Sequence, residues 1–242
     1  MISVIIPTYN EEKNIERCLK SLENQTVPRN EFEVIVVDGQ SKDRTVEIAK
    51  KYADKIIQQK SKGVGGARND GARVAKGDII ATTDADCILF KNWIKRIQKN
   101  LKRKNVIGMY GILKPIDIPD TRLKKIKYKV VFMIGNEFMK FTSKLDYHNI
   151  CGGNCAFDHE IFEKVGGYRS LPILDDLEIG TRIKRLGKII LDVKMLIGFS
   201  VRRLEKIGLQ KYSVLQIKNR IKLFLKKRIK EKYTRQEYSK VS

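Results

Sequence analysis

The feature that most restricts the fold of this chain is an apolar run, residues 79–83, which ends abruptly in two carboxylates, Asp84 and Asp86. A short β-branched run of this kind predicts a buried strand. Acidic side chains at the carboxyl end of such a strand lie where open α/β sheets bind ligands. Two carboxylates this close supply the oxygen ligands that hold Mg²⁺ beside substrate phosphates. Because the same triplet also occurs in plain turns, its meaning depends on the rest of the chain.

Strand and helix patterns alternate through the first 113 residues. Strands are predicted at 2–6, 33–37, 55–59, 78–83 and 106–113. Helices are predicted at 15–22, 46–50, 67–75 and 92–101. Alternation at this spacing predicts βαβ units with right-handed crossovers. The expected fold is therefore α/β, with helices layered on both faces of a mostly parallel sheet.

Polar residues follow three of the predicted strands. Thr8 and Tyr9 come after the first strand and Asp38 after the second, so with Asp84 and Asp86 they are expected at one edge of the sheet. The glycine-rich segment 63–66 is expected to be a loop that opens the third helix. Such a loop either is simply flexible or holds a phosphate with its backbone N–H groups.

The second half of the chain is harder to interpret. Residues 123–141 mix lysines with apolar side chains, which fits either a core helix or a surface lying on lipid. Gly152 and Gly153 precede Asn154, and glycines permit close approach of a ligand to the backbone. The adjacent pair Asp175 and Asp176 stands at the start of a helical pattern, where acids either cap the helix or perform chemistry.

The chain is strongly basic, with a formal net charge of +22. Residues 201–242 hold 14 Lys or Arg against three Glu, and residues 206–242 have an amphipathic helical pattern. This tail either packs on the preceding domain or lies on an anionic membrane surface. No apolar segment long enough to span a membrane occurs, and no signal peptide is expected. The four cysteines are expected as reduced thiols in a cytoplasmic protein, on the inner face of the membrane if the tail binds lipid.

Taken in order, six segments resemble the motifs of family 2 glycosyltransferases, which have a GT-A fold and transfer the sugar with inversion at the anomeric carbon. They are Pro7–Glu12, Val37–Thr45, Gly66–Ala72, Asp84–Asp86, Gly152–Asn154 and Asp175–Asp176. The resemblance covers about residues 1–190 and implies transfer of a sugar from a UDP- or GDP-sugar. It implies that the donor is bound by Pro7, Thr8, Tyr9, Glu11, Asp38, Gly66, Arg68, Asp84, Ala85, Gly153 and Asn154.

The resemblance also implies the reactive groups. Asp86, with Asp84, matches the ligands of Mn²⁺ or Mg²⁺, and Asp176 matches the general base. Asp175 stands where Glu is more usual in the family. The acceptor is expected to be a hydroxyl of a glycan or a lipid-linked molecule. A Gln-x-x-Arg-Trp motif is missing from the sequence, and Arg202 and Arg203 substitute for it poorly, so a single addition is expected rather than polymerisation.

The predicted organisation is a catalytic domain at 1–205, followed by a basic helical tail at 206–242. Within the domain, residues 1–110 form the nucleotide-binding half and residues 111–205 the acceptor half. A sugar nucleotidyltransferase is the alternative enzyme, but its long Gly-rich signature containing Arg near the first strand is missing. A nucleic-acid-binding protein is suggested by charge alone and has no accompanying motif, so no nucleic-acid partner is expected.

Overall fold

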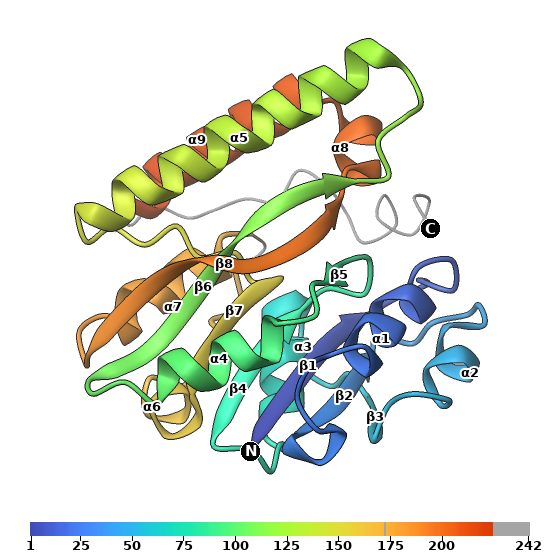
Figure 1. Ribbon diagram of the computed structural model, residues 1–242, viewed down its shortest axis with the longest axis vertical. Helices are drawn as coiled ribbons and strands as arrows, with labels where there is room; N and C mark the ends of the chain where they lie inside the picture. The colour runs from blue at the N-terminus through green and yellow to red at the C-terminus, as the bar shows by residue number, and fades with distance from the viewer. Residues whose placement is uncertain (172, 225–242) are drawn as a thin grey trace.

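The structure is a computed structural model that describes residues 1–171 and 173–224 of the 242-residue chain. Its centre is a sheet with the strand order β3-β2-β1-β4-β7-β6-β8-β5 (Figure 1). The strands are β1 Ile2–Thr8, β2 Phe32–Asp38, β3 Lys55–Gln58, β4 Ile79–Thr83, β5 Ile88–Leu89, β6 Val106–Ile116, β7 Asn154–Asp158 and β8 Lys188–Ser200. β1 pairs in parallel with β2 and β4, β2 with β3, and β6 with β8, whereas β7 is antiparallel to both of its neighbours.

Helices cover both faces of this sheet (Figure 1). One face packs against α1 Ile15–Glu23, α2 Thr45–Ala49 and α4 Trp93–Leu101. The other packs against α3 Gly63–Ala72, α6 His159–Lys164 and α7 Asp175–Ile183. Successive residues of β1 explain why its sequence is apolar without alternation, since Val4 and Ile6 enter the first core and Ile5 the second. The predicted three-layer α/β architecture is confirmed.

The glycine-rich segment 63–66 differs from its predicted loop. It forms the first turn of α3, which begins at Gly63. A methyl group on Gly66 would lie 2.8 Å from the carbonyl carbon of Ser61, so this turn packs tightly against the chain leading into it. The glycines are therefore needed for close backbone packing as well as for any contact with a ligand.

The segment that was hard to interpret forms α5, Arg122–Lys144. Its inner face buries Tyr128, Phe132 and Met139 against the body, while its outer face leaves large apolar side chains exposed. The interpretation of residues 123–141 as a core helix fits the inner face, whereas contact of the outer face with lipid stays a prediction. The predicted boundary at residue 110 falls inside β6, so the two expected halves share one continuous sheet.

Two further helices follow the last strand, α8 Arg202–Ile207 and α9 Leu209–Phe224, separated by Gly208. Leu209 and Tyr212 of α9 pack beside Tyr128 and Phe132 of α5. The first part of the predicted tail therefore packs on the domain, and residues 225–242 lie outside the described residues. Within the described ranges, no helix combines the length and apolarity needed to cross a bilayer. All four cysteines are free thiols, as expected.

The contact between α3 and the sheet predicts a measurable effect of one methyl group. An added Cβ at Gly71 would lie 2.5 Å from Ile5 and 3.1 Å from Val37, so we expect Gly71→Ala to lower the free energy of unfolding. Overpacking of this kind costs about 1–3 kcal/mol.

The matched control is Gly135→Ala in α5, where nothing lies within 4 Å of the added methyl. Better helix propensity there should raise stability by about 0.5–1 kcal/mol. Urea unfolding of both variants measures the difference, and equal stability of the two would contradict the packing argument.

Candidate active site

A cleft of about 2510 Å³ opens at the carboxyl ends of β1, β2 and β4. Ten of the residues predicted from the sequence line it, namely Pro7, Thr8, Tyr9, Glu11, Arg68, Asp84, Ala85, Gly153, Asp175 and Asp176. Four others do not line it, namely Asp38, Gly66, Asp86 and Asn154. The fold thus gathers at one site residues from both ends of the predicted catalytic domain.

Arg68 links three segments at the floor of the cleft. From the middle of α3, its guanidinium donates to Asp84 at 2.9 Å and lies 3.4 Å from Asp175, the first residue of α7. It also lies over the ring of Tyr168. Burial alone would lower the pKa of Arg68, but Asp84 and its other neighbours more than offset this and raise the pKa well above its usual value. Arg68 therefore stays charged and fixes both acids.

The acid pair stands at the amino end of α7. Leu174, just before it, has a left-handed backbone with φ of 62°, an uncommon conformation for a residue with a side chain. Asp176 accepts hydrogen bonds from the backbone N–H groups of Gly152 and Leu177, both at 2.8 Å. Burial and repulsion from Asp176 raise the pKa of Asp175 to about 6, although the nearby Arg68 charge acts to lower it.

The loop before β7 approaches these groups closely. The carbonyl of Gly152 accepts a hydrogen bond from Thr82 at 2.5 Å. A methyl group at Gly153 would lie 2.7 Å from a carboxylate oxygen of Asp84, and one at Gly152 would meet the guanidinium of Arg68. Only glycine leaves room at these two positions, so the Gly152–Gly153 backbone can pack directly against Arg68 and Asp84.

Asp38 shapes the site from behind. Its carboxylate accepts hydrogen bonds from the backbone N–H groups of Gln40 and Ser41, both at 3.0 Å, and from the Ser41 hydroxyl at 2.6 Å. Gly39 and Gln40, which belong to the loop that this carboxylate orders, line the cleft. The contact between Asp38 and a nucleoside base therefore stays a prediction, whereas its role in ordering the loop is visible.

Asn154 lies elsewhere than its predicted role requires. Its fully buried side chain accepts from the indole N–H of Trp93 at 2.8 Å. The same amide donates to the backbone carbonyls of Ile112 and Met195 at 3.0 and 3.1 Å. This side chain joins three strands to α4 and does not reach the cleft, in contrast to the prediction that it lines the donor site.

Asp84 and Asp86 form the part of the site suited to a cation. Together with Cys87 they place one ligand atom each within 4.8 Å of the others. Burial raises the pKa of the Cys87 thiol well above its usual value, so the thiol stays protonated and is a poor ligand. The two carboxylates remain, and such oxygen donors fit Mg²⁺ or Mn²⁺.

Two arginines that were not predicted as site residues lie beside Asp86, and one of them, Arg203, lines the cleft. Arg202 pairs with Glu11 and lies 3.3 Å from a carboxylate oxygen of Asp86. Arg203 lies 3.1 Å from Glu11 and 3.6 Å from Asp86. Asp86 in turn raises the pKa of Arg203. The signal in the sequence was a basic pair directly after the last strand, but its position opposite Asp86 depends on a contact across 116 residues.

Buried polar atoms also point to a ligand in the cleft. The Thr8 hydroxyl and the Nε of Arg68 are buried and have no hydrogen-bond partner among the residues the structure describes. Such groups are rare in folded proteins and usually have a partner such as water or a bound molecule. Both residues line the cleft, where a ligand can supply the missing acceptor.

An open α/β sheet with acids grouped at its carboxyl edge is the arrangement of the GT-A fold. The mannosyltransferase PcManGT from Pyrobaculum calidifontis, solved with GDP-Man and Mn²⁺, superposes with a TM-score of 0.68. It is 25% identical, over 83% of this chain and 56% of that one. TarS 1–349 of S. aureus, solved with UDP-GlcNAc, shows the same fold with a TM-score of 0.64. Its identity is 21%, over 82% of this chain and 58% of that one.

Residues 3–166 match the profile of Glycosyl transferase family 2, and the chain belongs to this family. Among curated relatives, glycosyltransferase AglE of Haloferax volcanii is 40% identical over 101 residues, which are 39% of this chain and 33% of AglE. A poly(ribitol-phosphate) beta-glucosyltransferase of Bacillus spizizenii is 32% identical over 168 residues, which are 62% of this chain and 26% of that protein. The matched region thus spans about a quarter to a third of these relatives.

The arginine contacts with Asp86 predict competition with a cation. Because Arg202 and Asp86 attract each other, Arg202→Gln should bind Mn²⁺ in the absence of nucleotide about tenfold more tightly, which is ~1.4 kcal/mol. Isothermal titration calorimetry with MnCl₂ measures this affinity.

The control is Arg96→Gln, which breaks an ion pair with Asp192 away from the cleft and should leave the affinity for Mn²⁺ unchanged. Equal or weaker Mn²⁺ binding by Arg202→Gln would show that the arginine does not compete for Asp86.

Proposed function

We propose that this protein is an inverting glycosyltransferase that moves a sugar from a nucleoside-diphosphate donor to a hydroxyl acceptor in one displacement. The observation that carries the proposal is the position of Arg68, which contacts Asp84 of the cation site on one side and Asp175 of the acid pair on the other. In such a displacement, leaving-group stabilisation and proton removal act on opposite sides of one carbon. Arg68 holds Asp84, for leaving-group stabilisation, and the acid pair, for proton removal, beside one cleft.

The donor is expected to bind along the edge formed by β1, β2 and β4. Thr8 and Tyr9 end β1 at this edge, and the loop ordered by Asp38 lies beside them. GDP-Man in the mannosyltransferase and UDP-GlcNAc in TarS support a donor of this class. These two donors differ in both base and sugar, so a screen must cover both.

Asp84 and Asp86 would hold Mn²⁺ or Mg²⁺, which supplies positive charge against the diphosphate that leaves. The mannosyltransferase was solved in complex with GDP-Man and Mn²⁺, which supports such a cation here. Arg203 lines the cleft beside these acids and is expected to turn from Asp86 to the diphosphate when the donor binds. Arg68 keeps Asp84 in place throughout.

Asp176 is the proposed general base. Backbone N–H groups of Gly152 and Leu177 donate hydrogen bonds that fix its carboxylate, which would take the proton from the acceptor hydroxyl. Asp175 holds the start of α7 against Arg68. The acceptor would then bind in the part of the cleft lined by α5 and α7.

The acceptor is proposed to be a hydroxyl of a glycan or of a lipid-linked molecule. Contact of residues 206–242 with an anionic membrane stays a prediction, because 225–242 lie outside the described residues. A nucleotidyltransferase or a nucleic-acid-binding protein has less support, since neither accounts for an acid pair linked to the cation site through Arg68.

A screen of nucleotide sugars tests the proposal. We expect one UDP- or GDP-sugar to raise the melting temperature only when Mn²⁺ or Mg²⁺ is present, and to be hydrolysed slowly. Asp176→Asn should keep this binding but lose about 10²–10⁴-fold in turnover, the usual contribution of a general base. The control Asp120→Asn, at a carboxylate that is 92% exposed, should behave as wild type.

Unchanged turnover in Asp176→Asn would remove its role as base. Salt-sensitive binding to any DNA, with no response to nucleotide sugars, would favour a nucleic-acid-binding protein.

The raised pKa of Asp175 predicts how turnover depends on pH. Because burial and repulsion from Asp176 both disfavour the ionised form of Asp175, the reactive pair should gain a proton as pH falls through about 6, and turnover should fall with it. Asp175→Asn removes one of the like charges, so the acidic limb should move to lower pH by about one unit. Profiles of kcat/KM between pH 4.5 and 8 measure the shift, and a move to higher pH would contradict this assignment.

A further inference from the structure

The outer side of α5 carries a continuous apolar stripe. Its members are spaced at three and four residues, so they lie on one face of the helix, opposite buried Phe132. They are Leu123, Ile126, Val130, Met133, Ile134, Phe138 and Phe141, all between 41% and 82% exposed. A soluble monomer rarely leaves so many large apolar side chains together in water, so this outer stripe is expected to have a partner.

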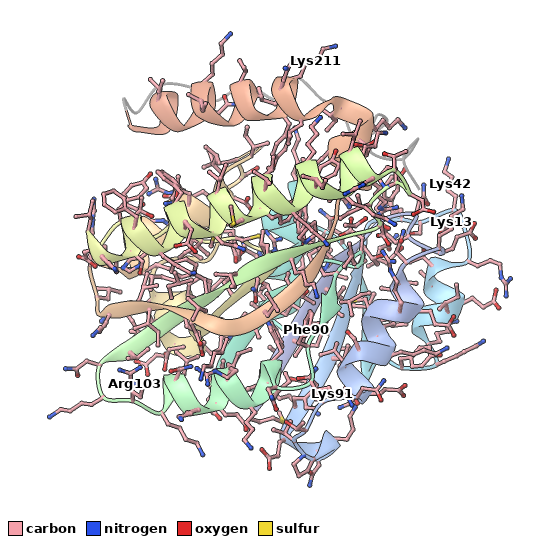
Figure 2. The ribbon with its side chains drawn as sticks, turned by 45° about the horizontal axis from the view of Figure 1, so that its top comes forward. Lys13, Lys42, Phe90, Lys91, Arg103 and Lys211 are labelled. Atoms are coloured by element: carbon pink, nitrogen blue, oxygen red, sulfur yellow. The ribbon has the colours of Figure 1, made fainter. Side chains whose placement is uncertain are left out.

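Helix α9 repeats the arrangement. Leu209 and Tyr212 face the body, while Val214, Ile217 and Ile221 are 50–59% exposed. In Figures 1 and 2, α5 and α9 run along the same edge of the molecule. In Figure 1 this edge lies at the top, beyond β6 and β8 and away from β1 and β2. Lys211 extends outward from α9 in Figure 2. Two amphipathic helices therefore present apolar side chains along one edge.

The charges on these helices indicate which partner fits. α5 holds seven Lys or Arg against one acid, Glu137, and α9 holds four Lys or Arg and no acid. An apolar stripe bordered by basic side chains is the pattern of helices that lie in the interface of an anionic bilayer. We propose that the outer faces of α5 and α9 form one surface that docks on an anionic lipid bilayer.

Two other occupants fit less well. A second copy of this chain would bring two basic surfaces face to face, and like charges repel across such an interface. Residues 225–242 carry seven Lys or Arg against two Glu, so as a covering segment they would meet the same repulsion. Anionic headgroups neutralise the lysines while their acyl chains accept the apolar stripe.

The position of the cleft gives the docking surface a consequence for the enzyme. Val131 and Phe138 of α5 line the cleft, as do Tyr212 and Leu215 of α9. The same two helices thus border both the docking surface and one side of the cleft. Docking would place this side of the cleft beside the headgroups, where the hydroxyl of a lipid-linked acceptor lies; this last step rests on the proposed function, whereas docking itself does not.

Sedimentation of the full chain with vesicles tests the docking surface. We expect the wild-type protein to bind vesicles that contain phosphatidylglycerol and to bind pure phosphatidylcholine about tenfold or more weakly. Leu123→Ser, Ile134→Ser and Phe141→Ser combined should weaken binding to the anionic vesicles by about tenfold or more, because insertion of the stripe is lost. These three side chains are at least 60% exposed and do not line the cleft.

The matched control combines Leu186→Ser and Val193→Ser, at exposed apolar positions outside both helices, and should bind as wild type. The proposal is overturned if wild type stays in the supernatant with anionic vesicles, or if the triple variant binds them as tightly as wild type. A lipid-free dimer that the triple variant converts to monomer in light scattering would instead assign the stripe to a second copy. None of these readouts requires turnover, so failure of docking and failure of the proposed reaction are distinguishable.

Discussion

The geometry of the site depends on the buried, positively charged guanidinium of Arg68. Arg68 lies in the middle of α3, and its guanidinium contacts the carboxylates of Asp84, just after β4, and Asp175, in α7, which are 16 and 107 residues away in the chain. A buried arginine is tolerated only when its charge is paired, and loss of one partner from such a pair usually costs about 3–5 kcal/mol. The same contacts that keep Arg68 inside the protein therefore also fix the distance between the cation site and the acid pair.

The sheet makes this contact possible. Parallel pairing of β1, β2 and β4 brings their carboxyl ends to one edge, and β7 enters antiparallel beside β4. That reversal brings Gly152 and Gly153, just before β7, to the end of β4, against Arg68 and Asp84. Asp176 then accepts a hydrogen bond from the Gly152 N–H, so the backbone of the loop before β7 holds the acid pair. Packing, charge pairing and backbone hydrogen bonds thus support the same geometry.

A family of enzymes with a shared core can differ at its edges. In this protein Arg203, α5 and α9 form a second boundary of the cleft, and Arg202 lies 3.3 Å from Asp86. The part of this boundary near Asp86 is basic, and the part formed by α5 is mostly apolar. It brings the region that would recognise an acceptor next to the surface proposed to meet a bilayer.

The sequence alone determined the alternation of strands and helices and the acids at strand ends, because periodicity and strand-end chemistry are local properties. It was enough to predict ten residues that line the cleft. Tertiary structure decided the rest: Asn154 is turned into the core by Trp93, the glycine segment 63–66 joins α3, and α5 shows an apolar face on each side. Each of these outcomes depends on contacts between residues far apart in the chain, which no local pattern specifies.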